Sequence, residues 1–378
     1  MAGRDGDRPV PAVRKLELQL VTACNLRCTY CANDPDVRDA PPRFMPLEMV
    51  ERCLDRLRPE IVSLTGGEVA LAGDRVLSAL ELARRYGARP VISSNLTVFR
   101  PADLDRLVEV GGVTGFFSSC NDLDDAMTLA VRGGRPAERR RLLENLAHIA
   151  RRGWPLSVET ILLRDTVGRL VELHRLLADL GVRQHRIEFL TPVGHASWGL
   201  MPDFEEVADA LERLYAQRAR DCHLELTCCP ITPCSPLAER LFPRDDPGVS
   251  AYHCTDGKDL CYVTAGGDMV PCYAFTCRPA PGNVGREDPR RIWEESPVFL
   301  RVRREAPPAC EGCRIATSRP GVTCTNGCWA MLLMGTGGLT QLCWEFAVAA
   351  RESALSGAGP GRLPVRRLEE VAGTGAHP

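Results

Sequence analysis

The stretch VTACNLRCTYCAND, residues 21–34, sets three cysteines in a C-x3-C-x2-C spacing. It directly continues the segment LELQLVT at 16–22, which alternates as a β-strand does. Thiolates are soft ligands that suit iron–sulfur clusters and zinc. A [4Fe–4S] cube has four iron corners, so three closely spaced thiolates leave one iron without a protein ligand. The spacing predicts such a cluster on Cys24, Cys28 and Cys31, and a zinc loop with a distant fourth ligand is the alternative.

Strand-like and helix-like patterns alternate from this loop to about residue 190. Further strand-like stretches lie at 60–65, 90–94, 114–119, 156–163 and 185–190. Six strands alternating with helices indicate parallel βαβ units. We therefore expect an α/β fold, a partial (β/α)6 TIM-like barrel followed by a small, irregular, Cys-rich iron–sulfur domain. Ligands of such sheets bind at the carboxyl ends of the strands, where the cysteine loop also lies.

The chain has 18 cysteines, and its start, MAGRDGDRPV, lacks the apolar core of a signal peptide. In a reducing compartment so many thiols favour metal binding over disulfides. A Cys-, Gly- and Pro-rich region this irregular usually needs metal to hold it together. The predicted divisions are an amino-terminal arm at 1–14, the barrel at 15–200, a helical, Cys- and Pro-rich linker at 201–250, the Cys-rich domain at 251–348 and a tail at 349–378.

Composition narrows the possible partners. The formal net charge is −2 and the pI is about 6.4. Such a balance gives no basic surface for nucleic acid. The sequence also lacks a run of about 18 apolar residues, the length that a membrane helix requires. We expect a cytoplasmic protein that binds neither nucleic acid nor membrane.

Three later segments follow the first cysteine loop in order: LTGGEVAL at 64–71, SSNLT at 93–97 and FFSSCND at 116–122. Together with the cysteine loop they resemble the radical S-adenosylmethionine (SAM) superfamily. The resemblance implies that the open iron binds the amino and carboxylate groups of SAM. Cleavage of SAM would then give a 5′-deoxyadenosyl radical that abstracts hydrogen from a substrate. Val69 and the pair Asn121-Asp122 depart from the family, which usually has a proline and often an Asp-Gly pair there.

The resemblance also assigns cofactor-binding roles to particular residues. Gly66 and Gly67 allow close backbone approach, and Glu68 accepts hydrogen bonds from the SAM ammonium group. The other expected cofactor contacts are Tyr30, Ser94, Asn95, Ser119 and Glu159. Ordinary strand-end turn residues are the alternative for Ser94 and Asn95, and a satisfied buried carboxylate is the alternative for Glu159.

The late cysteines, with the segment CYVTAGGDMVPC at 261–272, resemble the SPASM domain, which carries two auxiliary [4Fe–4S] clusters. By that resemblance one auxiliary cluster binds Cys254, Cys261, Cys272 and Cys328, and the other binds Cys310, Cys313, Cys324 and Cys343. The ten-residue gap between Cys313 and Cys324 is longer than is usual in the family. Structural zinc sites are the alternative. The sequence does not decide among three roles for the remaining cysteines of the linker: a further metal site, the lining of the substrate entrance, or no role beyond the linker. These cysteines are Cys222, Cys228, Cys229 and Cys234.

The resemblance implies an oxidoreductase that abstracts hydrogen and passes one electron to an auxiliary cluster. SPASM enzymes mostly crosslink, epimerise or oxidise ribosomally made peptides, and this hypothesis is slightly favoured. The second is dehydrogenation or epimerisation of a small molecule such as an aminocyclitol in natural-product biosynthesis. It fits the short stretch before the first strand, where many peptide maturases carry a leader-binding domain. A third, non-catalytic hypothesis is an electron-transfer or scaffold protein. A flavodoxin- or ferredoxin-type protein is the expected electron donor.

The group that accepts the substrate's proton is left open by the sequence. Sulfatase-maturing relatives have an aspartate where this chain has Tyr273, directly after Cys272. Tyr273, Glu188, His195 and Asp268 are the candidates. Cys120, beside the expected SAM rim, is a candidate hydrogen donor or proton acceptor, with a buried bystander as its alternative.

Overall fold

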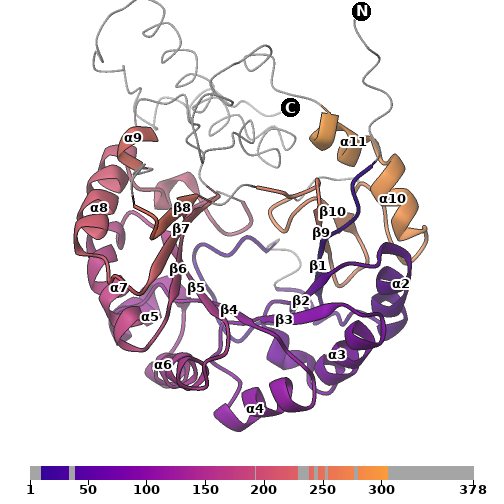
Figure 1. The fold of residues 1–378 in the computed structure, drawn as a ribbon, viewed down its shortest axis with the longest axis horizontal. Coiled ribbons are helices and arrows are strands. Elements are labelled where there is room, and N and C mark those ends of the chain that lie inside the picture. The colour runs from indigo at the N-terminus through magenta and orange to yellow at the C-terminus, as the bar shows by residue number, and fades with distance from the viewer. Residues whose placement is uncertain are drawn as a thin grey trace, which may run out of the picture.

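The computed structural model describes residues 10–33, 39–191, 193–228, 238–241, 246–251, 254–275 and 280–304. One sheet dominates it, with the strand order β10-β9-β1-β2-β3-β4-β5-β6-β7-β8. Neighbouring strands are parallel throughout, except for the antiparallel hairpin of β9 and β10. Figure 1 shows the sheet curling into an open barrel with helices around its outside. The strands are β1 (Lys15–Gln19), β2 (Ile61–Thr65), β3 (Arg89–Ser93), β4 (Phe116–Ser119), β5 (Leu156–Leu162), β6 (Gln184–Phe189), β7 (His223–Thr227), β8 (Val249–Ala251), β9 (Leu260–Val263) and β10 (Met269–Val270).

The helices follow the strands in βα order and cover the outer face of the barrel (Figure 1). Helix α2 illustrates why they form, because Val50, Cys53, Leu54 and Leu57 recur at helical spacing and are all buried. The helices are α2 (Leu47–Leu57), α3 (Arg75–Arg85), α4 (Pro101–Glu109), α5 (Asp125–Arg132), α6 (Pro136–Arg151), α7 (Leu170–Asp179), α8 (Phe204–Gln217), α9 (Ala238–Leu241), α10 (Pro289–Glu295) and α11 (Pro297–Arg304), with short 3-10 turns η2 (Val69–Ala72), η3 (Val167–Arg169) and η4 (Trp198–Leu200).

Alternate strand residues face opposite sides of the sheet, which divides the apolar side chains into separate cores. On β5, Val158 packs in the large core that includes α2, α3 and α6, whereas Ile161 belongs to a second core. That second core contains Tyr30 of the first cysteine loop together with Tyr262 and Cys272 of the β9–β10 region. The barrel therefore joins the two cysteine regions through its interior.

The expected alternation of six strands with helices is confirmed by β1 to β6. The structure adds strands where the sequence predicted irregular chain. Strands β7 and β8 come from the stretch expected to be a helical linker, and β9 from the Cys-rich region pairs directly with β1. The domain divisions stay predictions. Five expected auxiliary ligands, Cys310, Cys313, Cys324, Cys328 and Cys343, lie outside the described residues.

In the described part of the chain, every helix is too short or too polar to cross a membrane.

A buried histidine pair ties β6 to α7. His174 and His185 stack with ring centroids 5.3 Å apart, and their Nδ1 atoms lie 3.0 Å from each other. The backbone N–H of Ala219 donates to Nε2 of His174 at 3.1 Å, so His174 carries its proton on Nδ1 and donates to His185. His185 then donates from Nε2 to Thr160 at 2.8 Å, and Thr160 donates to the Cys120 carbonyl oxygen at 2.8 Å. The chain of hydrogen bonds is complete only while both rings are neutral.

Protonation of this pair should destabilise the fold in weak acid. Burial lowers the pKa of His174 to about 4, and burial together with His174 lowers the pKa of His185. The unfolded chain takes up these protons near pH 6.5, so stability falls as the pH drops from there towards 4. Between pH 7 and pH 5 His174 alone contributes a loss of about 2 kcal/mol. Urea midpoints of the wild type at these two pH values check this.

The variant His174→Gln tests the pair. It should lower the midpoint at pH 7 but reduce its change between pH 7 and pH 5, because it removes one of the two buried rings. An unaltered pH response in His174→Gln contradicts this account.

Candidate functional site

The carboxyl ends of β1 and β2 are joined by backbone contacts. Gly67 N–H donates to the Val21 carbonyl oxygen at 2.7 Å, and Glu68 N–H donates to that of Ala23 at 2.7 Å. A Cβ on Gly67 would lie 2.3 Å from the Ala23 oxygen, and one on Gly66 would lie 2.7 Å from the Val21 oxygen. Only glycine fits this approach. The two glycines therefore fix the chain that enters the cysteine loop.

The three cysteines of this loop lie together and are each half-buried. Leu26 N–H points to the Cys24 sulfur at 3.4 Å, and Cys31 N–H donates to the Cys28 carbonyl oxygen at 3.3 Å. Burial raises the pKa of the Cys24 thiol to about 12, and the nearby charges of Cys28 and Cys31 add to the rise. Iron would bind these groups as thiolates. The donor set fits an iron–sulfur cluster.

Among the described residues, no three His, Cys, Asp or Glu side chains are grouped as ligands of a single metal ion. The cysteine ligands of a [4Fe–4S] cluster each bind a different iron atom, so they do not need to converge on a single point.

Glu68 joins β2 to the end of β3. Its Oε1 accepts from Ser94 Oγ at 2.7 Å and from Ala70 N–H at 3.0 Å, and its Oε2 accepts from Asn95 N–H at 2.8 Å. Burial raises the pKa of Glu68, while these three hydrogen bonds act in the opposite direction. Oε2 retains capacity for one further donor. Ser94 thus holds Glu68 in place, and Glu68 can receive a cofactor ammonium group through Oε2.

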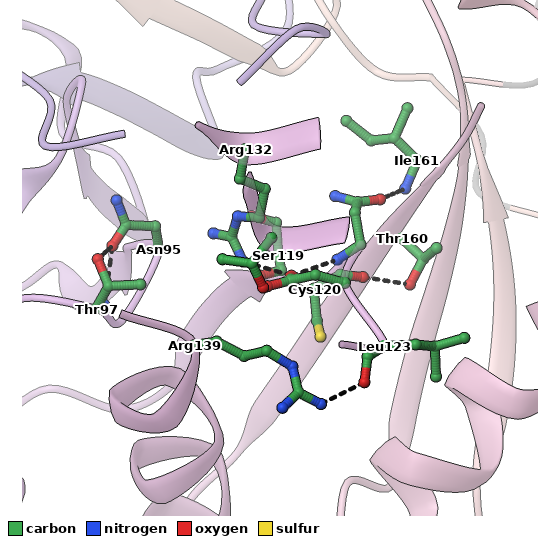
Figure 2. Close-up of polar contacts among 12 residues, drawn as sticks. Asn95, Thr97, Ser119, Cys120, Leu123, Arg132, Arg139, Thr160 and Ile161 are labelled. Carbon is green, nitrogen blue, oxygen red and sulfur yellow. Dashed lines mark hydrogen bonds and ion pairs between the residues drawn. The ribbon is translucent and has the colours of Figure 1, made fainter. Parts of the chain in front are cut away.

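Asn95 extends from β3 to the cysteine loop. Its amide N–H donates to Asn25 Oδ1 at 3.0 Å and approaches the Cys24 sulfur at 3.8 Å. Its Oδ1 accepts from the Thr97 hydroxyl at 2.6 Å (Figure 2), and Asn25 donates to that hydroxyl at 2.9 Å. The structure therefore places Asn95 beside a predicted cluster ligand, where it orients the loop.

Tyr30 connects the cysteine loop to β5. Its hydroxyl accepts from Asn121 Nδ2 at 2.7 Å, and Asn121 Oδ1 accepts from Ile161 N–H at 2.7 Å. Tyr30 and Asn121 are both buried. Asn121, which follows β4 where the family often has an Asp-Gly pair, here fixes the last turn of the loop.

Arg132 is a site residue that the sequence reasoning missed. It is 1% exposed, and its NH1 donates to the Ser119 carbonyl oxygen at 3.2 Å and to Asp122 at 3.1 Å (Figure 2). Its Nε and NH2 atoms have no hydrogen-bond partner in the described structure. Burial alone would lower the pKa of this guanidinium, but Tyr30, Asp122 and Cys28 lie close enough to raise it overall. A buried guanidinium with free nitrogens beside the cysteine loop fits a carboxylate such as that of SAM. The available signal was its place on the buried face of α5, with Thr128 and Val131.

Gly194 and His195 lie against the cysteine loop from the end of β6. The backbone N–H of His195 donates to the Cys31 carbonyl oxygen at 2.8 Å. Gly194 has a φ of 67°, and a Cβ there would lie 2.6 Å from the same oxygen. The structure thus places His195 at the rim, as its position after strand six predicts, and shows a backbone role for it.

Cys120 faces the outer core. It is fully buried among apolar side chains between the sheet and its helices, and Figure 2 shows its sulfur pointing away from Arg132. Burial raises the pKa of its thiol to about 12. This geometry favours the buried-bystander alternative over a hydrogen donor or proton acceptor.

The described cysteines of the second region lie in two different places. Asp256 is hydrogen-bonded to both Cys254 and Cys272, which brings these two thiols together. Cys261 instead points to the outer core, fully buried with Cys53 of α2. The structure therefore unites two of the expected auxiliary ligands and does not bring Cys261 to them.

Tyr273 and Glu188 meet in the barrel interior. The Tyr273 hydroxyl donates to Glu188 Oε1 at 2.6 Å, and Glu188 is also hydrogen-bonded to Glu159. Glu159 pairs in register with Ser119, an expected cofactor contact. Asp268 lies elsewhere, on the β9–β10 hairpin, where it accepts from Asn283 at 2.8 Å. Of the candidate proton acceptors, Tyr273 and Glu188 thus form a connected pair.

The chain matches two family models in the same order as its cysteine regions. The first, the radical SAM superfamily, covers residues 18–177, and the second, an iron-sulfur cluster-binding domain called SPASM, covers residues 254–314.

The individual proteins that are similar to this chain have low sequence identity to it. The PqqA peptide cyclase of Streptomyces rochei is 28% identical over 320 residues, 78% of this chain and 79% of its own. The AdoMet-dependent heme synthase of Methanosarcina barkeri is 23% identical over 330 residues, 80% of this chain and 91% of its own. Among solved structures, Streptococcus suis SuiB bound to its precursor peptide SuiA gives a TM-score of 0.64 at 15% identity, over 85% of this chain and 73% of SuiB, which shows a shared fold.

A radical SAM domain binds a [4Fe–4S] cluster and SAM, and a SPASM domain binds auxiliary iron–sulfur clusters. Both family matches begin close to the cysteine regions whose geometry is described above, so the chain belongs to the radical SAM superfamily and matches the SPASM domain over residues 254–314.

Proposed function

We propose that this enzyme is a radical SAM oxidoreductase that modifies a peptide. The observation that supports it most is the shared interior core, in which Tyr30 of the first cysteine loop packs in one cluster with Cys272 of the second region. A substrate held beside this core would lie near both the SAM site and an auxiliary cluster. Such an arrangement suits hydrogen abstraction followed by loss of one electron and one proton, a net two-electron oxidation.

For the SAM site we propose Cys24, Cys28 and Cys31 as cluster ligands, with the remaining roles on the surrounding strand ends. When bound, the cluster and SAM supply the 5′-deoxyadenosyl radical. Glu68 receives the SAM ammonium group and Arg132 its carboxylate, while Ser94 orients Glu68. The other residues that we propose to contact or position the cofactor are Tyr30, Gly66, Gly67, Asn95 and Ser119.

A peptide substrate is supported by two of the similar proteins. One is named a PqqA peptide cyclase, and another was crystallised with its precursor peptide. We propose crosslinking, epimerisation or side-chain oxidation of a ribosomally made peptide as the reaction. A cytoplasmic flavodoxin or ferredoxin would provide the electron that starts it.

The peptide hypothesis can be tested with anaerobically reconstituted enzyme, SAM, dithionite and candidate precursor peptides, in H2O and in D2O. We expect 5′-deoxyadenosine to form and one peptide to change mass, by loss of two hydrogens for a crosslink or oxidation, or by gain of one deuterium in D2O for an epimerisation. Liquid chromatography with mass spectrometry measures both products. Cys28→Ala should abolish both, because it removes a ligand of the SAM-binding cluster.

The matched control is Cys53→Ala, which alters a cysteine buried in α2 outside the site. It should retain both products. Formation of 5′-deoxyadenosine with neither a mass change in H2O nor deuterium uptake in D2O by any of these peptides would count against a peptide substrate. Its absence from the wild type would count against the radical SAM assignment itself.

For the auxiliary site we propose that Cys254 and Cys272 bind the same cluster and that Cys261 does not. The proposal departs from the sequence expectation because Cys261 packs with Cys53 in the outer core. Cys254→Ser and Cys272→Ser should each lower the iron content by up to about four atoms per chain. Cys261→Ser should keep the full iron content while lowering the thermal midpoint, because it puts a hydroxyl into an apolar core.

Iron analysis and Mössbauer spectra of the three variants check this ligand set. A loss of iron in Cys261→Ser equal to that in Cys254→Ser would restore the ligand set expected from the sequence.

A further inference from the structure

The interior faces of β5, β6 and β7 carry more negative than positive charge. Glu159, Arg186 and Glu225 are register neighbours on these three strands. Arg186 lies 3.0 Å from Glu225 and 3.7 Å from Glu159. Glu188 stands two residues further along β6, on the same face. Three carboxyl groups therefore surround one guanidinium.

Glu188 is the most buried of the three carboxyl groups, at 5% exposure. It is held by the Tyr273 hydroxyl at 2.6 Å and by a hydrogen bond to Glu159. Burial raises the pKa of Glu188 and the charge of Glu159 raises it further. Two acidic side chains thus meet through a single hydrogen bond.

Thr227 provides an independent sign of a ligand. It is the register neighbour of Glu188 on β7, and alternation along the strand places it on the interior face with Glu225. Thr227 is 1% exposed, yet its hydroxyl has no hydrogen-bond partner in the described residues. A buried hydroxyl without a partner is unfavourable unless a bound group satisfies it.

The carboxyl groups of this cluster are partly accessible. The side chains of Glu159 and Glu225 keep 25% and 20% of their surface accessible. Tyr273, which is hydrogen-bonded to Glu188, is 39% exposed. A small polar group could therefore reach Glu159 and Glu188 from the interior.

We propose that Glu159, Glu188 and Thr227 bind a primary ammonium group of the substrate. An ammonium head is compact and donates three hydrogen bonds, which matches three oxygen acceptors on adjacent strands. Its positive charge balances the negative charge of the carboxylates that the single guanidinium of Arg186 does not neutralise. This inference rests on the proposed function, which it extends to the substrate class: a lysine side chain of a peptide, or an amine of a small molecule.

The position of the site relates the ammonium group to the chemistry. Glu159 pairs in register with Ser119, on the side of the SAM site, and Glu188 contacts Tyr273, next to Cys272. An amine bound there would hold its neighbouring C–H bonds between the two cysteine regions.

Binding of amine probes to the reconstituted, SAM-loaded enzyme tests the site. Nα-acetyl-lysine amide represents a peptide lysine and Nα-acetyl-norleucine amide is its neutral counterpart. 2-Deoxystreptamine represents an aminocyclitol and myo-inositol is its neutral counterpart. We expect the wild type to bind at least one amine about tenfold more tightly than its neutral counterpart by calorimetry.

Glu159→Gln, Glu188→Gln and Thr227→Val should each reduce that preference to about threefold or less. The surface variant Glu81→Gln, which removes the same charge from an exposed position of α3, should keep it. Thr227→Val should not lower the thermal midpoint, because the hydroxyl that it removes has no partner in the folded protein.

The outcomes separate the two proposals. Preference for the lysine probe supports the site with a peptide substrate, and preference for the aminocyclitol supports the site with a small molecule. Equal binding of amines and neutral counterparts by the wild type overturns the ammonium site, as does an unchanged preference in the three site variants. Formation of 5′-deoxyadenosine, measured in the same samples, tests the radical SAM function independently.

Discussion

The structure depends on the close approach of two loops at the carboxyl ends of β1 and β2. Gly67 and Glu68 donate their backbone N–H groups to the chain just before Cys24, and no side chain fits between the two segments at Gly67. Glu68 then connects these two loops to the end of β3, because its carboxylate accepts hydrogen bonds from Ser94 and Asn95. The cysteine loop is thus positioned by backbone contacts before any metal binds. Cluster assembly would find its three thiols on a loop that is already anchored at its entrance.

Much of this arrangement could be predicted from the sequence, because it follows from local patterns. Strands β1 to β6 are short, apolar runs between helices with clear periodicity, and each was expected close to its observed place. The Gly-Gly-Glu segment was expected at the end of the second strand, where close backbone approach requires glycine. Strands β7 and β8 were missed. They lie in a Cys- and Pro-rich stretch, and β8 is only three residues long, so the pattern was too short to stand out.

Side-chain direction was harder to predict than position in the sheet. A cysteine is tolerated both in an apolar core and at a metal site, so spacing alone does not show which face of a strand it occupies. Cys120 and Cys261 both follow or lie within strands that carry site residues, and both face the outer core. Arg132 was not expected at the site, because it belongs to no recognised motif. Its place on the buried face of a helix nevertheless indicates a polar partner, since a charged side chain is seldom buried without one. Register and alternation, which need the structure, decide such cases.

The interior of the barrel links the two cysteine regions by polar as well as apolar contacts. The pairs Ser119–Glu159 and Glu188–Tyr273, with the hydrogen bond from Glu188 to Glu159, run from the SAM side to the residue after Cys272. A barrel filled only with apolar side chains would be more stable, because buried carboxyl groups carry a desolvation cost. Retaining several charges there makes sense when a bound molecule completes the set. The polar and apolar contacts of the interior therefore connect the two cysteine regions to each other.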